Sequence, residues 1–184
     1  GAALVVVLWM GLTGLLHMDG LADSADAWLG GHGDPGRTLE IMKEPTTGPA
    51  GIALMVGVIV VKVAALAALL PAGAALVAAP VLARAGTTWL LLTTNYVRDE
   101  GMGATAAANL PTAPAYAAVT LAVLFGLFLT GTAGFAAIVT GAIVLVFLRW
   151  LMQHRIGGVT GDSLGAAIEL VEAALLAVFA YALT

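Results

Sequence analysis

Three aspartates with helical spacing follow an uncharged apolar segment near the start of the chain. Asp19, Asp23 and Asp26 lie in the run HMDGLADSADAW at residues 17–28, with His17 two residues before the first of them. If this run is helical, the three carboxylates project within roughly 60° of one another, because each residue advances a helix by about 100°. Like charges on one face repel unless a cation joins them, and Mg²⁺ prefers carboxylate, phosphate and water oxygens. We therefore expect a magnesium site here; the alternative is a solvated acidic loop without a ligand.

A second polar block, RTLEIMKEPTTGPAG at residues 37–51, combines basic and acidic side chains. Arg37 and Lys43 could bind a phosphate group, and Glu40 and Glu44 fall on the same helical face as Lys43. Two prolines and a glycine then break the helix before the next apolar run. The alternative is an amphipathic interfacial helix with ordinary intrahelical ion pairs.

The third block, RIGGVTGDSLGAAIELVE at residues 155–172, leads into the last apolar run. Asp162 and Glu169 are seven residues apart and therefore share a helical face. The glycines of this block allow the backbone to approach a phosphate closely. N-capping of the following helix is the alternative role for Asp162. Glu169 and Glu172 both fall within the membrane, which implies a polar cavity there.

Lys62 and Arg84 lie inside apolar runs, where a charge near the membrane centre costs at least about 2.5–3.5 kcal/mol. Arg84 is in the middle of its run, so we expect it to face a polar interior and to be a functional candidate. The alternative is a structural ion pair with Glu169 or Glu172. For Lys62 we favour this alternative.

The composition indicates an integral membrane protein, because 61% of the residues are hydrophobic and only 10% are charged, against about 25% charged in soluble domains. The chain contains no cysteine, so any metal must be held by oxygen or imidazole ligands. The net charge of −4 comes from clustered acids and argues for bound cations. We expect membrane lipids as partners and no nucleic acid.

We expect an all-α bundle with about six membrane-spanning helices, in a single membrane-embedded catalytic domain over residues 1–184, since a bilayer core needs about 20 apolar residues per helix. The TGTAG sequence at residues 130–134 is expected to turn the chain between two spans, and PAGAA at residues 71–75 to do the same earlier. The candidate spans are residues 1–16, 49–70, 73–93, 113–130, 135–152 and 163–183.

Alternating the spans places the charged loops on one side of the membrane. The loops on the opposite side contain no charged residue, whereas these contain four basic residues, Arg37, Lys43, Arg98 and Arg155. Because Lys and Arg concentrate in cytoplasmic loops, we expect the polar site to face the cytoplasm of a bacterial or archaeal cell. The first apolar run lacks the basic region of a signal peptide, so we expect the natural chain to begin further upstream.

Together these blocks resemble the cobalamin-5'-phosphate synthase family, also called adenosylcobinamide-GDP ribazoletransferases, which are integral membrane enzymes. The resemblance rests on GLLHMDGLADSADAW, RTLEIMKEPTTGPAG, the Arg84 span leading into NYVRDEGMGA, and RIGGVTGDSLGAAIELVE. The four blocks appear in the family's order and cover nearly the whole chain. The sequence departs from the family pattern at two points. The N-terminal portion of the family is absent from this sequence, and Glu44, followed by Pro45, stands where the resemblance leads us to expect aspartate.

The resemblance implies a magnesium-dependent reaction that joins adenosylcobinamide-GDP to α-ribazole or its 5'-phosphate and releases GMP. A ribose hydroxyl would attack a phosphorus of the pyrophosphate, a transfer that depends mainly on positioning and charge neutralisation. Asp19, Asp23, Asp26 and Asp162 would hold the Mg²⁺, and one of them or His17 would accept the proton. The expected substrate-binding residues are Arg37, Glu40, Lys43, Arg84, Arg98, Thr160, Gly161, Glu169 and Glu172. A homo-oligomer is compatible with the sequence.

Three other functions remain open. A CDP-alcohol phosphotransferase also places aspartates at a cytoplasmic membrane surface and releases a nucleoside monophosphate, but Asp23 and Asp26 come too soon for its pattern and no AR pair follows them. A scaffold whose charges only mediate helix packing is a second alternative. A third is a cation transporter with a pathway formed by Lys62, Arg84, Glu169 and Glu172.

Overall fold

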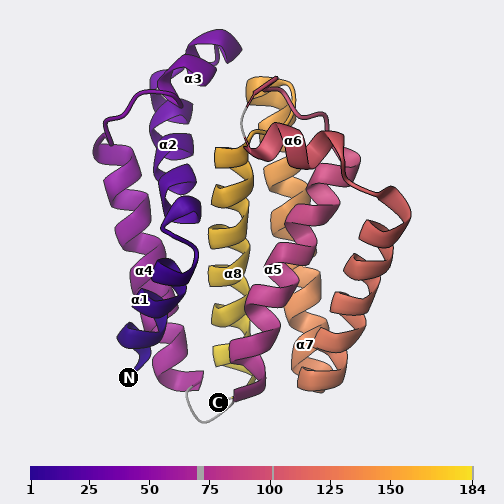
Figure 1. Cartoon of the computed structure of the whole chain (residues 1–184). Helices are drawn as coiled ribbons and strands as arrows, with labels where there is room; N and C mark the ends of the chain where they lie inside the picture. Colours follow the sequence, from indigo (N-terminus) through magenta and orange to yellow (C-terminus); the bar gives the residue numbers. More distant parts are fainter. Residues whose placement is uncertain (70–72, 101, 184) are drawn as a thin grey trace.

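Helices make up almost all of the described chain, and they form a bundle (Figure 1). The computed structural model describes residues 1–69, 73–100 and 102–183. Its helices are α1 (Ala2–Leu12), α2 (Leu16–Gly30), α3 (Pro35–Ile41), α4 (Pro49–Leu69), α5 (Gly73–Thr93), α6 (Met102–Ala108), α7 (Thr112–Ile156) and α8 (Gly161–Leu183). The described residues contain no strand apart from an isolated parallel bridge, so the prediction of an all-α protein is confirmed.

Helix α8 lies in the middle of the bundle, where it packs against α2, α4, α5 and α7 (Figure 1). Small side chains make this position possible, since Gly165, Ala166 and Ala167 allow neighbouring backbones to approach closely. Farther along the helix, Leu176 and Phe179 are fully buried and fill the core. The other helices therefore position their polar residues against α8.

Gly131 divides α7 into two arms that lie side by side (Figure 1). Its φ of 57° and ψ of −131° are not helical. A straight helix of 45 residues would be about 68 Å long, more than twice the bilayer core of about 30 Å. The turn predicted within residues 130–134 is therefore confirmed. The other predicted turn, at residues 71–75, begins with residues that lie outside the described ones.

The first apolar run is not a continuous helix. Helix α1 ends at Leu12, and the chain then turns through Gly14 and Leu15, which both have positive φ angles. An L residue such as Leu15 rarely adopts a positive φ, because its Cβ crowds the backbone. Helix α2 then leaves at 88° to α1. The span predicted for residues 1–16 is therefore broken, and its last residue begins α2.

Four helices, α4, α5, α7 and α8, are long and apolar enough to cross a membrane, and a fifth span results if α1 and α2 form one broken span. Large apolar side chains such as Leu121 and Phe128 point away from the bundle, as expected for a surface in contact with lipid. A polytopic helical membrane protein is thereby confirmed. The count of six spans, which treats the two arms of α7 separately, stays a prediction.

The polar segments gather at one end of the bundle. Figure 1 shows both termini at the opposite end from α3 and α6. The loop after α5 is joined to the loop after α7, since Val97 N–H donates to Val159 O (2.9 Å) and Val159 N–H donates to Asn95 O (2.8 Å). This end of the bundle therefore holds the blocks singled out in the sequence.

Candidate active site

Asp162 lies in the first turn of α8, and a different residue caps this helix. The Thr160 hydroxyl accepts a hydrogen bond from Ser163 N–H (3.1 Å), and the Ser163 hydroxyl accepts one from Thr160 N–H (2.8 Å). This reciprocal arrangement resembles a capping box and satisfies two backbone donors at the helix start. Because Thr160 supplies the cap, the Asp162 carboxylate is left for other partners.

Two glycines let α2 pack closely against the start of α8. A Cβ at Gly20 would lie 2.6 Å from Asp162 O, and a Cβ at Gly165 would lie 3.2 Å from His17 Cα. No side chain separates the two backbones at these points, which is how small residues bring helices together in membranes. The aspartates of α2 therefore come beside Asp162.

Asp23 is at the centre of the resulting acidic cluster. The charges of Asp19, Asp26 and Asp162 all repel that of Asp23, while Arg98 attracts it. Asp23 is half-buried, whereas Asp19 is exposed. Several carboxylates that repel one another are stabilised when a cation lies between them. Helix α2 therefore places its three aspartates near one another, and α8 brings the fourth expected ligand, Asp162, beside them. Their role as metal ligands stays a prediction.

Arg98 supplies the positive charge of this cluster. Its Nη1 lies 2.6 Å from Asp162 Oδ2. The loop that carries Arg98 is held in place by the backbone bridge from residues 95–97 to Val159. Nε and Nη2 of Arg98 are buried and form no hydrogen bond with the described residues. A guanidinium with donors to spare is suited to a phosphate, which can accept two parallel hydrogen bonds.

Asp26 anchors the start of α4. Its Oδ2 accepts a hydrogen bond from Gly48 N–H (2.7 Å), and its Oδ1 accepts one from Gly51 N–H (2.9 Å). Both glycines lie so close to the carboxylate that a Cβ at either would collide with it. An acidic side chain that accepts N–H groups at a helix start also interacts favourably with the helix dipole. Asp26 therefore has a structural role in addition to its place in the acidic cluster.

The donor set of the cluster suits a hard cation that prefers oxygen. Asp19, Asp23 and Asp162 offer carboxylate oxygens alone, and Mg²⁺ is commonly held by one or two carboxylates with substrate phosphates and water. Among the described residues, no group of three or more histidine, aspartate or glutamate side chains is arranged to hold a metal ion by itself. Any Mg²⁺ bound beside these carboxylates would therefore need substrate oxygens and water to complete its coordination.

Lys43 faces the same cavity as Arg98. This cavity, which we call the larger cavity, has a volume of about 710 Å³ and is lined by Leu39, Lys43, Val97, Arg98, Asp99 and Glu100. Two basic side chains from different segments thus converge on one space beside the acidic cluster. These two side chains could contact phosphate oxygens of a pyrophosphate, while Asp99 and Glu100 place two acidic side chains in the same lining.

Arg37 and Glu40 lie on the outer surface of α3. Arg37 Nη1 is 3.3 Å from Glu40 Oε2, and Arg37 Nη2 is 3.7 Å from Glu44 Oε1. Asp34 caps the helix by accepting a hydrogen bond from Arg37 N–H (2.8 Å). The side chain of Arg37 is 54% exposed. The geometry of this helix favours the ion-pair alternative for Arg37 and Glu40.

An ionic network of Lys62, Arg84, Glu169 and Glu172, which we call the buried ionic network, joins α4, α5 and α8. The side chains of Lys62 and both glutamates are buried, and that of Arg84 is 43% exposed. Lys62 Nζ lies 2.6 Å from Glu169 Oε2 and 2.7 Å from Glu172 Oε1. Arg84 Nη1 lies 3.1 Å from Glu172 Oε2. Two positive and two negative charges balance, which reduces the cost of placing them among apolar helices. The geometry favours the ion-pair alternative for both basic residues.

His17 lies beside this network and not among the aspartates. Its Nδ1 is 3.8 Å from Glu169 Oε1. The cavity that Lys62, Arg84 and the two glutamates line has a volume of about 10 Å³, which is close to the least that holds one water molecule. The described residues of the network therefore leave space for about one water molecule between them, which disfavours the cation-transport alternative.

Two residues near the cluster were not singled out from the sequence. The Tyr96 hydroxyl accepts a hydrogen bond from Gly161 N–H (3.0 Å), and Asp99 lines the larger cavity. Both lie in NYVRDE, a polar stretch between two apolar runs, and that position is the signal that could have found them. Gly161 itself, an expected substrate-binding residue, lies at the start of α8 and is exposed.

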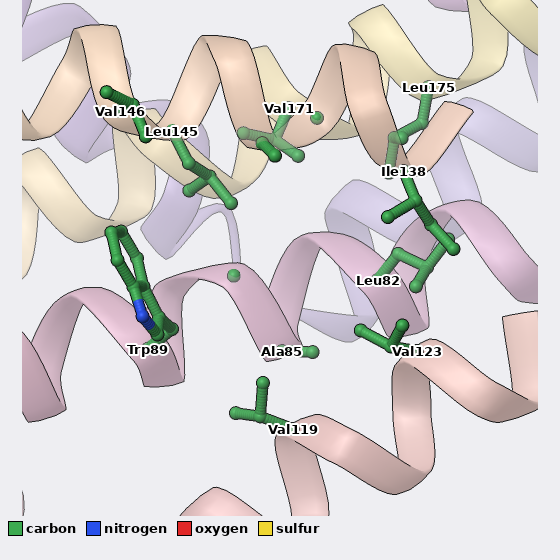
Figure 2. A pocket seen from close by; sticks show the side chains of 13 residues that line it. Leu82, Ala85, Trp89, Val119, Val123, Ile138, Leu145, Val146, Val171 and Leu175 are labelled. Atoms are coloured by element: carbon green, nitrogen blue, oxygen red, sulfur yellow. The ribbon is translucent and has the colours of Figure 1, made fainter. Parts of the chain in front are cut away.

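A separate apolar cavity lies between α5, both arms of α7, and α8 (Figure 2). Its volume is about 240 Å³. Figure 2 shows its lining of aliphatic side chains with Trp89 at one end. The lining contains no titratable side chain, so this cavity offers nothing that could take part in phosphoryl transfer.

Comparisons with known proteins agree with the family resemblance found in the sequence. A sequence model of the family described as cobalamin-5-phosphate synthase matches residues 1–180. The chain is 50% identical to the adenosylcobinamide-GDP ribazoletransferase of Stutzerimonas stutzeri (strain A1501), over 95% of this chain and 72% of that protein. It is 46% identical to the protein of the same name from Pseudomonas syringae pv. syringae (strain B728a), over 95% and 73%. No solved structure matches the chain.

Proposed function

Because this chain belongs to the cobalamin-5-phosphate synthase family, we propose that it is an adenosylcobinamide-GDP ribazoletransferase. One structural observation carries the proposal beyond the family name. Asp23 and Asp162, from distant parts of the chain, come together with Arg98 beside a cavity that Lys43 also lines. Carboxylates and basic side chains that surround one space are the parts that transfer between phosphates needs.

The reaction that we propose joins adenosylcobinamide-GDP to α-ribazole or its 5'-phosphate. A ribose hydroxyl of the ribazole attacks the cobinamide-side phosphorus, and a new P–O bond forms. The P–O bond to the GMP part breaks, GMP leaves with the electron pair, and the hydroxyl proton passes to a base. A carboxylate of the acidic cluster is well placed for that role, since His17 lies beside the buried ionic network instead.

We infer that one or two carboxylates from Asp19, Asp23 and Asp162 would hold Mg²⁺ together with phosphate oxygens of the substrate, with Asp26 retained as the anchor of α4. The oxygen-only donor set and the mutual repulsion of the carboxylates support this inference. When bound there, the cation would supply neutralisation of charge on the pyrophosphate and on the leaving GMP. Arg98 and Lys43 would orient phosphate oxygens, and the ion pair with Asp162 would hold the Arg98 guanidinium in a fixed direction.

We infer that the protein resides in the bacterial cytoplasmic membrane with its active site toward the cytoplasm. The bacterial relatives and the apolar helices support the location. The basic residues of the loops that join the spans support the orientation, because Lys and Arg are retained on the cytoplasmic side.

The proposed function is tested by measuring GMP release from detergent-purified protein given adenosylcobinamide-GDP and α-ribazole, with Mg²⁺ or with EDTA. We expect GMP formation that requires both substrates and stops in EDTA. GMP formation unaffected by EDTA would contradict the metal proposal alone. Release of CMP from a CDP-alcohol, without release of GMP from the first pair, would favour the other phosphotransferase.

A further inference from the structure

A second cavity adjoins the larger one at Arg98. This smaller cavity has a volume of about 420 Å³ and is lined by Leu91, Thr94, Tyr96, Arg98, Asp99, Ala104, Ala107 and Ala108. Arg98 and Asp99 line both cavities. An enzyme that joins two substrates must hold them next to each other, and two cavities with a shared wall meet that requirement.

One wall of the smaller cavity is a face of α6 made of alanines. Ala104, Ala107 and Ala108 are spaced by three and four residues, so they lie on one side of the helix. Their methyl groups form a shallow apolar surface without side-chain hydrogen-bonding groups, and Leu91 of α5 adds to it. Such a surface suits a flat apolar group, such as an aromatic ring system.

Tyr96 provides an aromatic wall to the same cavity. Its hydroxyl accepts a hydrogen bond from Gly161 N–H at the start of α8. The same hydroxyl lies so close to Gly103 of α6 that a Cβ at this glycine would collide with it. Tyr96 is therefore held from two sides, and a fixed aromatic ring is a good stacking surface for a heterocyclic base.

Arg98 links the smaller cavity to the acidic cluster. Arg98 and Asp99 contribute charged side chains to the lining, and Arg98 is paired with Asp162, which lies beside Asp23. A nucleoside with its ring on the alanine face would therefore direct its ribose toward the cluster. The hydroxyl that attacks would then lie on the side where the pyrophosphate is bound.

We propose that the smaller cavity binds the aromatic nucleoside substrate, α-ribazole, with its ring on the alanine face of α6 beside Tyr96 and its ribose toward Arg98 and Asp99. This inference rests on the proposed function, which requires such a substrate. The volume of the smaller cavity lies in the range of about 300–1,000 Å³ that small-molecule sites have. The larger cavity, with Lys43 and Arg98, is left for the nucleoside diphosphate part of the other substrate.

The test compares Ala107→Phe, which fills the smaller cavity, with Ala106→Phe, a matched change on the exposed side of α6. We expect Ala107→Phe to raise the KM for α-ribazole about tenfold, since loss of a stacking site has that magnitude. The KM for adenosylcobinamide-GDP should stay within about twofold, because the coupling energy between changes at separate sites is small. Ala106→Phe should change neither constant.

An equal rise in both KM values, or the same rise in Ala106→Phe, would overturn the inference while leaving the proposed function intact. Tyr96→Leu, which removes the ring, gives a second variant should Ala107→Phe unfold, and it should show the same selective rise in KM. Equilibrium dialysis of α-ribazole tests the cavity without turnover. If the wild-type protein binds α-ribazole and releases no GMP, the proposed function fails and the cavity stands; if it binds none, the inference fails.

Discussion

At the scale of single residues, the acidic side chains of the first block divide between two roles. Asp23 lies among carboxylates and Arg98, whereas both oxygens of Asp26 accept hydrogen bonds from backbone N–H groups at the start of α4. The two residues are three positions apart and have the same chemistry. Their neighbours, which come from other parts of the chain, decide what each contributes. Substitution of Asp23 should therefore change turnover, and substitution of Asp26 should change the free energy of unfolding.

Asp23→Asn is expected to lower kcat by at least about 100-fold, because it removes a charge from the group proposed to neutralise the transition state. GMP release at saturating substrates measures this loss. Asp34→Asn is the matched control, since Asn caps α3 as well as Asp does and should leave turnover unchanged. Full magnesium-dependent turnover by Asp23→Asn would contradict the role given to this carboxylate.

Asp26→Ala is expected to lower the free energy of unfolding by about 1–2 kcal/mol, because the start of α4 loses two hydrogen bonds to a carboxylate. Unfolding of the purified protein in mixed detergent micelles, without substrate or metal, measures this change. Asp19→Ala is the comparison, since Asp19 is exposed and should affect stability much less. Equal stability of the two variants would argue against an anchoring role for Asp26.

At the scale of elements, close contact between α2 and α8 brings the acidic residues together. Gly20 and Gly165 are the points of closest approach. Glycine weakens an isolated helix, and here it allows two backbones to meet without intervening side chains. The position of Asp162 relative to Asp23 thus depends on residues that carry no chemistry.

Gly20→Ala is expected to lower the free energy of unfolding by about 1–3 kcal/mol, because its Cβ would overlap the Asp162 backbone and the helices would have to separate. Turnover should fall as well, since Asp162 would move away from α2. Gly57→Ala is the control: it has open space around it and a better helix former should be neutral or slightly stabilising there. Unchanged stability and turnover in Gly20→Ala would mean that the helices can shift without consequence.

At the scale of the whole molecule, ionic contacts inside the bundle hold three helices in register. Lys62 of α4 contacts both glutamates of α8, and Arg84 of α5 contacts one of them. Apolar side chains gain little by leaving lipid for another helix, so polar contacts have more weight in a membrane bundle. The network therefore positions α4, α5 and α8 relative to one another below the active site.

Lys62→Met is expected to lower the free energy of unfolding by about 3–5 kcal/mol, because Glu169 would be left buried without its main partner. Unfolding in mixed micelles measures this change. The double variant Lys62→Met with Glu169→Gln should recover part of the loss, since it removes the unpaired charge. A double variant less stable than Lys62→Met would contradict this pairing.

The orientation of the whole molecule is accessible to labelling, since the chain contains no cysteine. A membrane-impermeant maleimide added to intact spheroplasts is expected to label Thr132→Cys, near the turn of α7, and to leave Thr46→Cys unlabelled. Both should react after lysis, which controls for accessibility. The reverse pattern would place the active site outside the cell.

Some of the site could be predicted because its signals are local. Helical periodicity places Asp19 and Asp23 on one face of a helix, independently of the rest of the chain. The blocks that resemble the family are short runs of consecutive residues, so they too can be recognised in the sequence. The partner of Arg98, the cap of α8 by Thr160 and the cavity beneath α6 were not predictable in this way. Each depends on which segments come into contact. The backbone bridge between the loop after α5 and the loop after α7 brings these segments together.

The sequence by itself determined that this is an all-α membrane protein of a particular enzyme family, because hydropathy, helical spacing and motifs are properties of consecutive residues. Only the tertiary structure decided which charges are paired with each other and which remain for substrate. Lys62 is paired with Glu169 and Asp26 with backbone N–H groups, whereas Arg98 contacts Asp162 through Nη1 and lines both cavities. Nε and Nη2 of Arg98 form no hydrogen bond with the described residues. The physical reason is that an ionic contact depends on distances of a few ångströms between helices, and the order of residues along a chain does not set those distances.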